Sequence, residues 1–384
     1  MKHKSLILKL VPIFFVFYVM GFCDIVGVSV TYAKEEFNWS EIQASFLPSM
    51  VFLWFLVLSI PTAVFMGKIG RKNIVLLSIA FTFIGMLIPF FRFNIVTCYI
   101  AFALLGIGNA ILQVSLNPLL SNIVENKQLT SSLTAGQFIK SISAFLGPIL
   151  VSFFSIYFNN WTLIFLLYSI IAMLSGIWLY FSPIRREQVS MERFSYNTTF
   201  ELFKNKQIVI LFLGILCIVG LDVGMNISVP KILMERVGLA KEAAGYGTSW
   251  YFAARTIGTF IGMFLLTKIA ELKYFRLNMV IAMVALVALM FAYTQVSILC
   301  LVVIIAFTCS CVFSIIYSVA LQIAPDRKNE ISGLLITGVA GGAVFPPLMG
   351  ICSDFLGNQI GAILVIGICA FYLFFCAFKI KPLS

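Results

Sequence analysis

The chain has 384 residues, of which 61% are hydrophobic and only 11% are charged, and its mean hydropathy is +1.06. An ordinary soluble domain has about 25% charged residues, so this composition excludes a water-soluble protein and predicts an all-α polytopic membrane protein. The only histidine, His3, excludes histidine-based catalysis and a His-rich metal site, and no clustered nucleophile and base are found, so we predict no enzyme activity, no metal site and no cofactor.

Unbroken apolar runs of about 20 residues, the length of a spanning helix, follow one another along the chain. The strands of a membrane barrel would instead alternate over about 10 residues. The runs predict twelve transmembrane helices at 8–31, 44–66, 74–91, 95–124, 132–155, 160–182, 208–230, 243–266, 277–293, 296–323, 332–353 and 359–379. We therefore expect an N-terminal six-helix bundle at 1–182, a cytoplasmic linker at 183–207 and a C-terminal six-helix bundle at 208–384.

The positions of Lys and Arg predict the orientation, because cytoplasmic loops of membrane proteins carry an excess of both. With the N-terminus in the cytoplasm, most of the 26 Lys and Arg residues fall in cytoplasmic loops and tails. The external loops hold only Lys34, Arg92, Lys231, Arg236 and Lys241. Both termini are thus predicted to be cytoplasmic in a bacterial inner membrane. The net charge of +11 reflects this bias and requires no nucleic-acid partner.

The two halves of the chain repeat one another. Three pairs of residues recur at nearly the same sequence separation and at the same place in their helices: Asp24 with Asp222, Lys68 with Lys268, and Pro148 with Pro347. This repeat indicates duplication of a six-helix unit. Two parallel six-helix halves are the architecture of the major facilitator superfamily, whose substrate site lies at mid-membrane between the halves.

Four ionisable residues lie inside predicted spans, clear of their ends: Asp24, Lys140, Asp222 and Arg255. An ionisable group in the hydrocarbon costs about 2.5–3.5 kcal/mol on insertion scales, so it must face a cavity or a partner. Within each half the natural pairs are Asp24 with Lys140 and Asp222 with Arg255. Either the carboxylates couple transport to protons, or the pairs are static and fix helix packing.

The fourth span carries three amides, Asn109, Gln113 and Asn117, at intervals that place them on one helix face. Such a stripe predicts either a wet cavity suited to a polyhydroxylated ligand or interhelical hydrogen bonds. The further candidates for lining a substrate cavity are Gln137, Lys140, Asn226, Trp250, Tyr251, Arg255 and Tyr317.

The loop after the second span reads Gly67-Lys-Ile-Gly70-Arg71-Lys72. A glycine turn with basic residues at this place is similar to the signature loop between spans 2 and 3 of the superfamily, so we expect a cytoplasmic gating loop formed by Gly67, Gly70, Arg71 and Lys72. The usual acidic member of that motif is absent, since Gly67 takes its place. The alternative is that these bases only contribute to the cytoplasmic charge bias.

Over nearly its whole length the chain resembles the fucose/galactose/glucose:proton symporters of the major facilitator superfamily. Asp24 falls where that family has a proton-carrying aspartate, and Gln113-Val-Ser-Leu-Asn-Pro118 is similar to its Glu-x-x-x-Asn-Pro motif. The segments Ile257–Gly262 and Gly333–Gly350 are similar to its span 8 and span 11 motifs. The resemblance implies proton-coupled uptake of a monosaccharide or sugar derivative by alternating access, with the proton as coupling ion.

The chain also departs from this family at charged positions. Gln113 replaces an acid, Lys140 replaces an amide, and Thr259 replaces an arginine while Arg255 lies one turn earlier. These bases raise an anionic sugar, such as a uronate or a sialic acid, as an alternative substrate. A second alternative is an exporter of metabolites or drugs on the same fold. In each case the expected partners are a small molecule and the lipid bilayer, and one chain forms a complete pathway as a monomer.

Overall fold

The structure is a computed structural model that describes residues 2–39, 41–184, 199, 201–239 and 241–380; most of the predicted linker lies outside these residues. All of the regular elements that it describes are helices. In chain order they are α1 (Lys2–Met20), η1 (Gly21–Ile25), α2 (Val26–Phe37), α3 (Glu41–Ile69), α4 (Arg71–Phe91), α5 (Ile95–Ser121), α6 (Asn126–Phe158), α7 (Leu163–Phe181), η2 (Leu202–Lys204), α9 (Lys206–Val237), α10 (Lys241–Leu265), α11 (Glu271–Met290), α12 (Gln295–Cys309), α13 (Val312–Ile323), η3 (Pro325–Arg327), α14 (Lys328–Thr337), η4 (Gly338–Ala340), α15 (Gly341–Leu356) and α16 (Ile360–Lys379).

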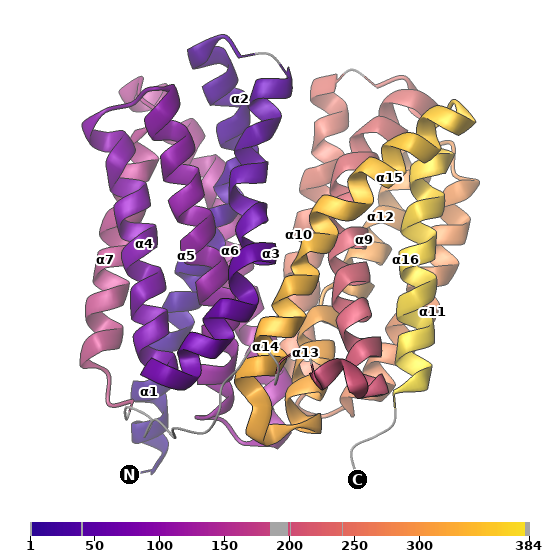
Figure 1. Cartoon of the computed structure of the whole chain (residues 1–384). Coiled ribbons are helices and arrows are strands. Elements are labelled where there is room, and N and C mark those ends of the chain that lie inside the picture. The colour runs from indigo at the N-terminus through magenta and orange to yellow at the C-terminus, as the bar shows by residue number, and fades with distance from the viewer. Residues whose placement is uncertain (1, 40, 185–198, 200, 240, 381–384) are drawn as a thin grey trace. The chain divides into compact units, whose positions relative to one another are not determined.

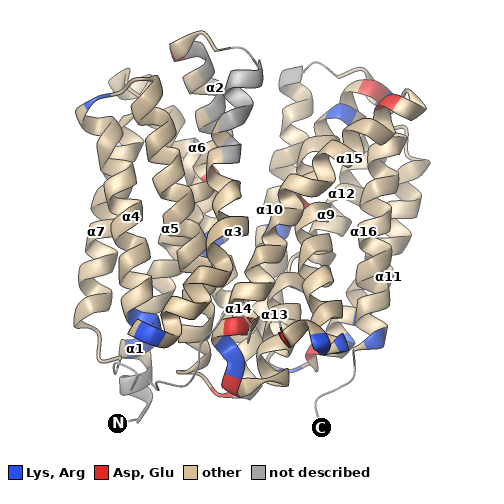
Figure 2. Ribbon diagram, viewed as in Figure 1, with Lys and Arg blue, Asp and Glu red and all other residues tan. Residues whose placement is uncertain are grey.

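Eleven segments among the described residues are long and apolar enough to cross a membrane. The remaining predicted span, the eighth at 243–266, corresponds to α10, a helix of 25 residues that contains four Gly and three Thr residues and carries Arg255. Charged residues in both units gather mainly at helix ends, as expected when the middle of each helix lies in hydrocarbon (Figure 2). The twelve predicted spans therefore correspond to observed helices.

The chain divides into two compact units, within each of which most of the contacts between residues are made. The first comprises Met1–Glu125, Gly136–Glu201 and Asp326–Thr337, and the second comprises Asn126–Ala135, Leu202–Pro325 and Gly338–Ser384. In the first unit α5 packs against α3 and α4, α7 packs against α1 and α4, and α14 packs against α3 and α5. In the second unit α9 packs against α10, α13, α15 and α16 (Figure 1). The predicted linker at 183–207 would instead separate two bundles that are each continuous in sequence, and this division stays a prediction.

Three predicted spans are interrupted in the structure. The first consists of α1, η1 and α2, the tenth of α12 and α13, and the eleventh of α14, η4 and α15. Just after the last interruption, Gly341 lets α15 approach α9 closely, because a Cβ on this residue would collide with the backbone carbonyl of Leu216. The predicted spans at 8–31, 296–323 and 332–353 are found, and each contains a local interruption that apolar length alone does not reveal.

Two local motifs recur at equivalent places in the two halves, as a duplication requires. Both α5 and α12 begin with a capping box, formed by Asn94 with Thr97 and by Thr294 with Ser297. These side chains satisfy N–H groups at the helix start that have no intrahelical partner.

The second recurring motif is a cation that closes the last helix of a bundle. The ammonium of Lys72, near the start of α4, donates to the carbonyls of Tyr180, Ser182 and Ile184 at 3.1, 3.0 and 3.4 Å, at and just beyond the end of α7. Arg276 near the start of α11 likewise donates to the carbonyl of Ala377 in α16 at 3.0 Å. A positive charge at a helix C-terminus is favourable because the last carbonyls are unsatisfied and the helix dipole is negative there.

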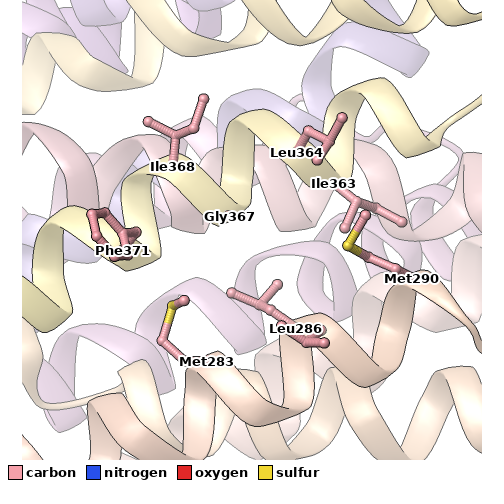
Figure 3. A pocket seen from close by; sticks show the side chains of 9 residues that line it. Met283, Leu286, Met290, Ile363, Leu364, Gly367, Ile368 and Phe371 are labelled. Carbon is pink, nitrogen blue, oxygen red and sulfur yellow. The ribbon is translucent and has the colours of Figure 1, made fainter.

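The outer face of the second unit carries an apolar groove of about 280 Å³ between α11 and α16 (Figure 3). Its lining is entirely apolar and includes Met283, Met290, Gly367 and Phe371. The side chains of Val287 and Ile368 along it are 51% and 66% exposed, as expected for a surface that faces lipid chains. A groove without polar groups gives a hydroxylated ligand nothing to bind, so the polar candidate site lies elsewhere.

Candidate functional site

The polar cluster of the first unit is centred on a break in the first span. At η1 the chain tightens into a 3-10 helix that contains Asp24. Gly21 makes the break possible at close range, because a Cβ on this residue would lie 2.6 Å from the carbonyl oxygen of Lys140 and 2.6 Å from the Cβ of Ser143. The absence of a side chain at Gly21 thus brings η1 directly against α6 and places Asp24 beside Lys140.

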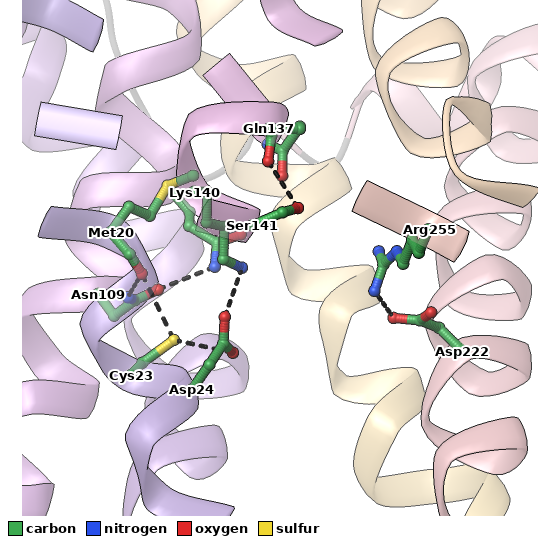
Figure 4. A network of polar contacts seen from close by, with 10 residues as sticks. Met20, Cys23, Asp24, Asn109, Gln137, Lys140, Ser141, Asp222 and Arg255 are labelled. Atoms are coloured by element: carbon green, nitrogen blue, oxygen red, sulfur yellow. Dashed lines mark hydrogen bonds and ion pairs between the residues drawn. The ribbon is translucent and has the colours of Figure 1, made fainter. Parts of the chain in front are cut away.

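Asp24 and Lys140 form an ion pair, with 3.9 Å between Oδ2 and Nζ (Figure 4). The side chain of Asp24 is 37% exposed and that of Lys140 is 21% exposed. The thiol of Cys23 has two possible acceptors, the carbonyl of Met20 at 3.5 Å and Asp24 Oδ1 at 3.6 Å. The predicted pairing of Asp24 with Lys140 is confirmed, and the carboxylate remains partly accessible.

The three amides of α5 make hydrogen bonds within the first unit. Asn109 Nδ2 donates to the carbonyl of Met20 at 2.6 Å, and Gln113 Nε2 donates to Asn109 Oδ1 at 2.8 Å (Figure 4). Asn117 Nδ2 donates to the carbonyl of Gln113 at 3.2 Å. All three side chains are buried. Of the two alternatives for this stripe, these contacts favour interhelical bonding for Asn109, which ties α5 to the last residue of α1 before η1.

The polar cluster of the second unit contains Asp222, Arg255 and Tyr251. The Arg255 guanidinium contacts Asp222 Oδ2 directly through Nη1, and the Tyr251 hydroxyl donates to Asp222 Oδ1 at 2.6 Å. The side chains of Arg255 and Asp222 are 30% and 20% exposed, and Tyr251 is fully buried. The predicted pairing of Asp222 with Arg255 is confirmed, and both oxygens of Asp222 have a partner. The role of Tyr251 as the second partner was not predicted, although it shares a helix face with Arg255.

The remaining cavity candidates differ in exposure. Gln137 is partly buried, and its carbonyl accepts from the hydroxyl of Ser141 at 2.9 Å. The carbonyl of Asn226 accepts from Thr248 at 3.2 Å. Trp250 is 56% exposed, whereas Tyr317 is fully buried and stacks on Phe313 with ring centroids 5.8 Å apart. Burial argues against Tyr317 as a surface for stacking a sugar and leaves Trp250 as the more accessible of the two aromatic side chains.

The predicted loop at Gly67–Lys72 is reduced to Gly70 in the structure, because α3 ends at Ile69 and α4 begins at Arg71. Gly70 has φ of 84°, a conformation that favours glycine, and it precedes the first residue of α4. Arg71 Nε donates to Asn329 Oδ1 at 2.7 Å and thus joins α4 to α14. Lys72 instead binds the carbonyls at the end of α7, so its contacts close a bundle. A gating role for Gly67, Gly70, Arg71 and Lys72 stays a prediction.

One buried polar cluster was not predicted. In the second unit Glu271 accepts hydrogen bonds from Thr130 Oγ1 and from Gln322 Nε2, and the hydroxyl oxygens of Thr130 and Ser318 are in hydrogen-bond contact at 2.6 Å. Ser131 donates to the carbonyl of Met263 at 2.7 Å. The sequence signal is weak, because an acidic residue at a helix start is also what the helix dipole favours. These contacts hold the first turns of α6 against α11 and α13.

Known proteins of similar sequence align with nearly the whole chain. A putative glucose/galactose transporter of Helicobacter pylori is 24% identical over 403 residues, which cover 99% of this chain and 98% of that protein. A glucose/galactose transporter of Brucella abortus is 20% identical over 394 residues, which cover 97% and 94%. Both alignments extend over nearly the full length of each protein.

The fold is shared with a solved transporter. The crystal structure of the Escherichia coli fucose:proton symporter FucP superposes with a TM-score of 0.85 at 17% identity and covers 98% of this chain and 100% of that chain. A crystal structure of FucP in the outward conformation gives a TM-score of 0.87. At this identity the likeness shows the fold, which confirms the predicted architecture of twelve transmembrane helices in two six-helix halves.

The family model described as Major Facilitator Superfamily matches residues 10–345, most of the chain. Together with the helical fold, the internal repeat and the acid–base pair in each unit, this match shows that the chain belongs to the major facilitator superfamily.

Proposed function

We propose that this protein is a proton-coupled symporter that imports a neutral monosaccharide across a bacterial inner membrane by alternating access. The observation that carries the proposal is the Asp24–Lys140 pair, a partly exposed carboxylate at a helix break inside a membrane span. Ionisable groups inside spans mark ion and substrate pathways. The similar proteins named glucose/galactose transporter and fucose:proton symporter support a sugar as the substrate.

The two carboxylates differ in how firmly they are held, which assigns them different roles in the proposal. Asp24 has a single cationic contact at 3.9 Å and is 37% exposed. Asp222 is held by Arg255 and by Tyr251, and it is 20% exposed. A group that exchanges protons must reach water and leave its partner, so Asp24 is the proton carrier. Asp222 is then a static partner that keeps Arg255 in place, rather than the second coupling site.

Charge balance favours a neutral substrate over a uronate or a sialic acid. Both bases inside the spans, Lys140 and Arg255, contact an acid of the same unit. A substrate carboxylate would have to displace Asp24 or Asp222 and leave that acid without its counter-ion, which is costly in a poorly hydrated site. Amides such as Gln137 and Asn226 donate and accept hydrogen bonds and so suit sugar hydroxyls.

Two segments supply contacts that alternating access has to break. In the first unit α14, from the second half of the sequence, packs on α3 and α5, and Ser332 donates to the carbonyl of Val114. In the second unit the first turns of α6, from the first half, are held by Glu271 and the carbonyl of Met263. With both termini cytoplasmic, these contacts lie at the cytoplasmic ends of the spans. A monomer suffices for this cycle, since one chain provides both halves.

Uptake by proteoliposomes under an inward proton gradient tests the proposal. Labelled D-glucose, D-galactose and L-fucose are compared with labelled glucuronate and N-acetylneuraminate. Accumulation of a neutral sugar that collapses with the gradient, and that is lost in Asp24→Asn, is expected. Accumulation of acidic sugars alone would make Lys140 and Arg255 the carboxylate site. Uptake of none of them, with release of preloaded compounds, would support an exporter.

A further inference from the structure

The apolar groove between α11 and α16 continues into a basic surface at one end of the two helices. On α11, Lys273, Arg276, Met283, Val287 and Met290 follow one another at intervals of three, seven, four and three residues. Side chains at such intervals lie on one helix face. Met283, Val287 and Met290 line the groove, and Lys273 is exposed. This face of α11 therefore changes from apolar to basic toward the start of the helix.

The face of α16 that lines the groove shows the same change toward the end of that helix. Leu364, Ile368 and Phe371 line the groove, and Phe375 and Lys379 follow at intervals of four residues. Phe375 is 45% exposed, and Lys379 is also exposed. Each of the two helices thus carries a continuous face with an apolar part at the groove and a lysine at its end.

The basic residues of the two helices gather at the same end. Arg276 Nε donates to the carbonyl of Ala377 at 3.0 Å, so the start of α11 lies beside the end of α16 (Figure 2). Lys273 and Lys379 therefore lie on either side of this contact. No acid among the described residues forms an ion pair with either lysine. The nearest acid in sequence, Glu271, is bound to side chains of α6 and α13 instead.

We propose that this surface binds an anionic phospholipid, with the phosphate at Lys273 and Lys379 and one acyl chain in the groove between α11 and α16. The proposal does not rest on sugar transport or on proton coupling. Basic residues between transmembrane helices recognise anionic headgroups, and a groove without polar groups matches a hydrocarbon chain. Because the two features lie on the same two helix faces, a molecule with a negative head and an apolar chain fits both.

The distances along the helices agree with the size of a phospholipid. Met283 lies seven residues beyond Arg276, and Val287 lies eleven residues beyond it, which is about 10 and 16 Å along a helix. The hydrocarbon of one leaflet is about 15 Å deep, half the thickness of the bilayer core. An acyl chain whose phosphate lies at the level of Arg276 therefore ends in the groove. Phe375 and Phe378, 45% and 51% exposed, offer this chain an apolar surface before it reaches the groove.

The opposite end of the groove is less suited to the phosphate. Arg236 approaches that end, where its guanidinium donates to the carbonyls of Leu289 and Ala292 at 2.7 and 2.8 Å. The residue before it, Glu235, adds a negative charge. One base beside an acid attracts an anion less than three bases do. The headgroup therefore lies at the start of α11, the end that the positions of Lys and Arg predict to be cytoplasmic.

Native mass spectrometry of the purified full-length protein measures the Kd of the first bound lipid. The probes are dioleoyl phosphatidylglycerol, which is anionic, and dioleoyl phosphatidylcholine, which has the same chains and no net charge. The unmodified protein should bind phosphatidylglycerol at least about fivefold more tightly. Lys273→Gln and Lys379→Gln should each weaken phosphatidylglycerol about fivefold, the effect of losing one basic residue near an anionic lipid. Neither variant should change the Kd of phosphatidylcholine.

Two choices keep the charge test specific. Arg276 is left unchanged because it also joins the two helices through the carbonyl of Ala377. Lys231→Gln removes an exposed lysine of the same unit, near the end of α9 that is predicted to be external, and should leave both affinities unchanged.

Filling the groove tests the acyl chain separately. A Cβ on Gly367 meets no atom within 4 Å, so the side chain of Gly367→Leu has room in the groove. This variant should weaken both lipids by about fourfold or more, the effect of withdrawing one methylene from an apolar surface. Gly350→Leu on α15 is the matched control, because a Cβ there also meets no atom within 4 Å. It should leave both affinities unchanged.

Each part of the proposal has an outcome that overturns it. Equal affinity for the two lipids would refute the anionic headgroup. If Lys231→Gln weakens phosphatidylglycerol as much as Lys379→Gln does, the attraction is a general effect of charge and the site is wrong. If Gly367→Leu binds both lipids as the unmodified protein does, the acyl chain lies outside the groove. Soluble glycerol phosphate should not displace phosphatidylglycerol, and displacement would show that the bases bind a free phosphate rather than a phospholipid.

Discussion

Replacing Gly21 with alanine should move η1 away from α6 and weaken the Asp24–Lys140 pair. A Cβ at residue 21 would lie 2.6 Å from the carbonyl oxygen of Lys140, whereas ordinary contact begins at 3.4 Å. The two elements must therefore separate by about 0.8 Å, the difference between these distances. Neither the carbonyl of Lys140 nor the Cβ of Ser143 is the end of a flexible side chain, so the backbone has to move. Overpacking of this kind costs about 1–3 kcal/mol in stability.

The same movement changes the charge interaction by a calculable amount. If the ion pair lengthens equally, its separation rises from 3.9 Å to about 4.7 Å, and at an effective dielectric constant of about 20 the attraction falls by about 0.7 kcal/mol. Water around the 37% exposed carboxylate reduces this loss further. The weaker ion pair adds to the cost of overpacking, so both effects lower the stability of Gly21→Ala.

Thermal unfolding in detergent measures the combined effect. Gly350→Ala in α15 is the matched control, because a Cβ there meets no atom within 4 Å and alanine favours a helix over glycine by about 1 kcal/mol. Gly21→Ala should be less stable than the unmodified protein, and Gly350→Ala should be equally or more stable. A Gly21→Ala variant with unchanged stability would refute the close approach of η1 to α6.

Three further predictions concern the other polar contacts. Lys72→Met should lower the free energy of unfolding by about 2–4 kcal/mol, because three carbonyls lose a charged donor; a thermal-unfolding temperature equal to that of the unmodified protein would contradict this. Asp222→Asn should lower the free energy of unfolding, measured by chemical denaturation, by about 1–3 kcal/mol, less than for a fully buried pair, because Arg255 is 30% exposed. Adding Arg255→Gln to this variant should recover part of the lost stability. If the two losses simply add, the two side chains do not interact. Glu271→Ala should weaken the contacts that hold the first turns of α6. With Ser131→Cys as the reporter, a thiol reagent should then label residue 131 about threefold faster or more. An unchanged labelling rate would exclude Glu271 from these contacts.

Several features of the fold could be predicted because a bilayer imposes them locally. A spanning helix needs about 20 apolar residues whatever its neighbours are, so the twelve spans follow from apolar runs. Ionisable residues in such runs need a partner, and the repeat suggested that Asp24 pairs with Lys140 and Asp222 with Arg255, as observed. The interruption at η1 was missed because Gly21 reads as an ordinary small residue until the backbone of α6 is placed against it.

The candidate site was predicted as a set of residues rather than as an arrangement. The sequence places Asn109, Gln113 and Asn117 on one face, but the same pattern fits a wet cavity and a bonded helix contact. The structure favours the bonded contact for Asn109 because its amide reaches the carbonyl of Met20, a residue far away in the chain. The Glu271 cluster was missed for the same reason, since its partner Thr130 comes from the other half of the sequence.

The sequence by itself determined that this protein lies in a lipid bilayer. It also determined the number of spans, the internal repeat and the four charges that lie inside the membrane. These properties depend on composition and on short-range periodicity, which the hydrocarbon core selects residue by residue. Only the tertiary structure decided how firmly each charge is held: Asp24 has one contact at 3.9 Å and partial exposure, while Asp222 has two partners. That difference arises from how closely neighbouring helices approach, which depends on the packing of residues distant in sequence, such as Gly21 against the backbone at Lys140.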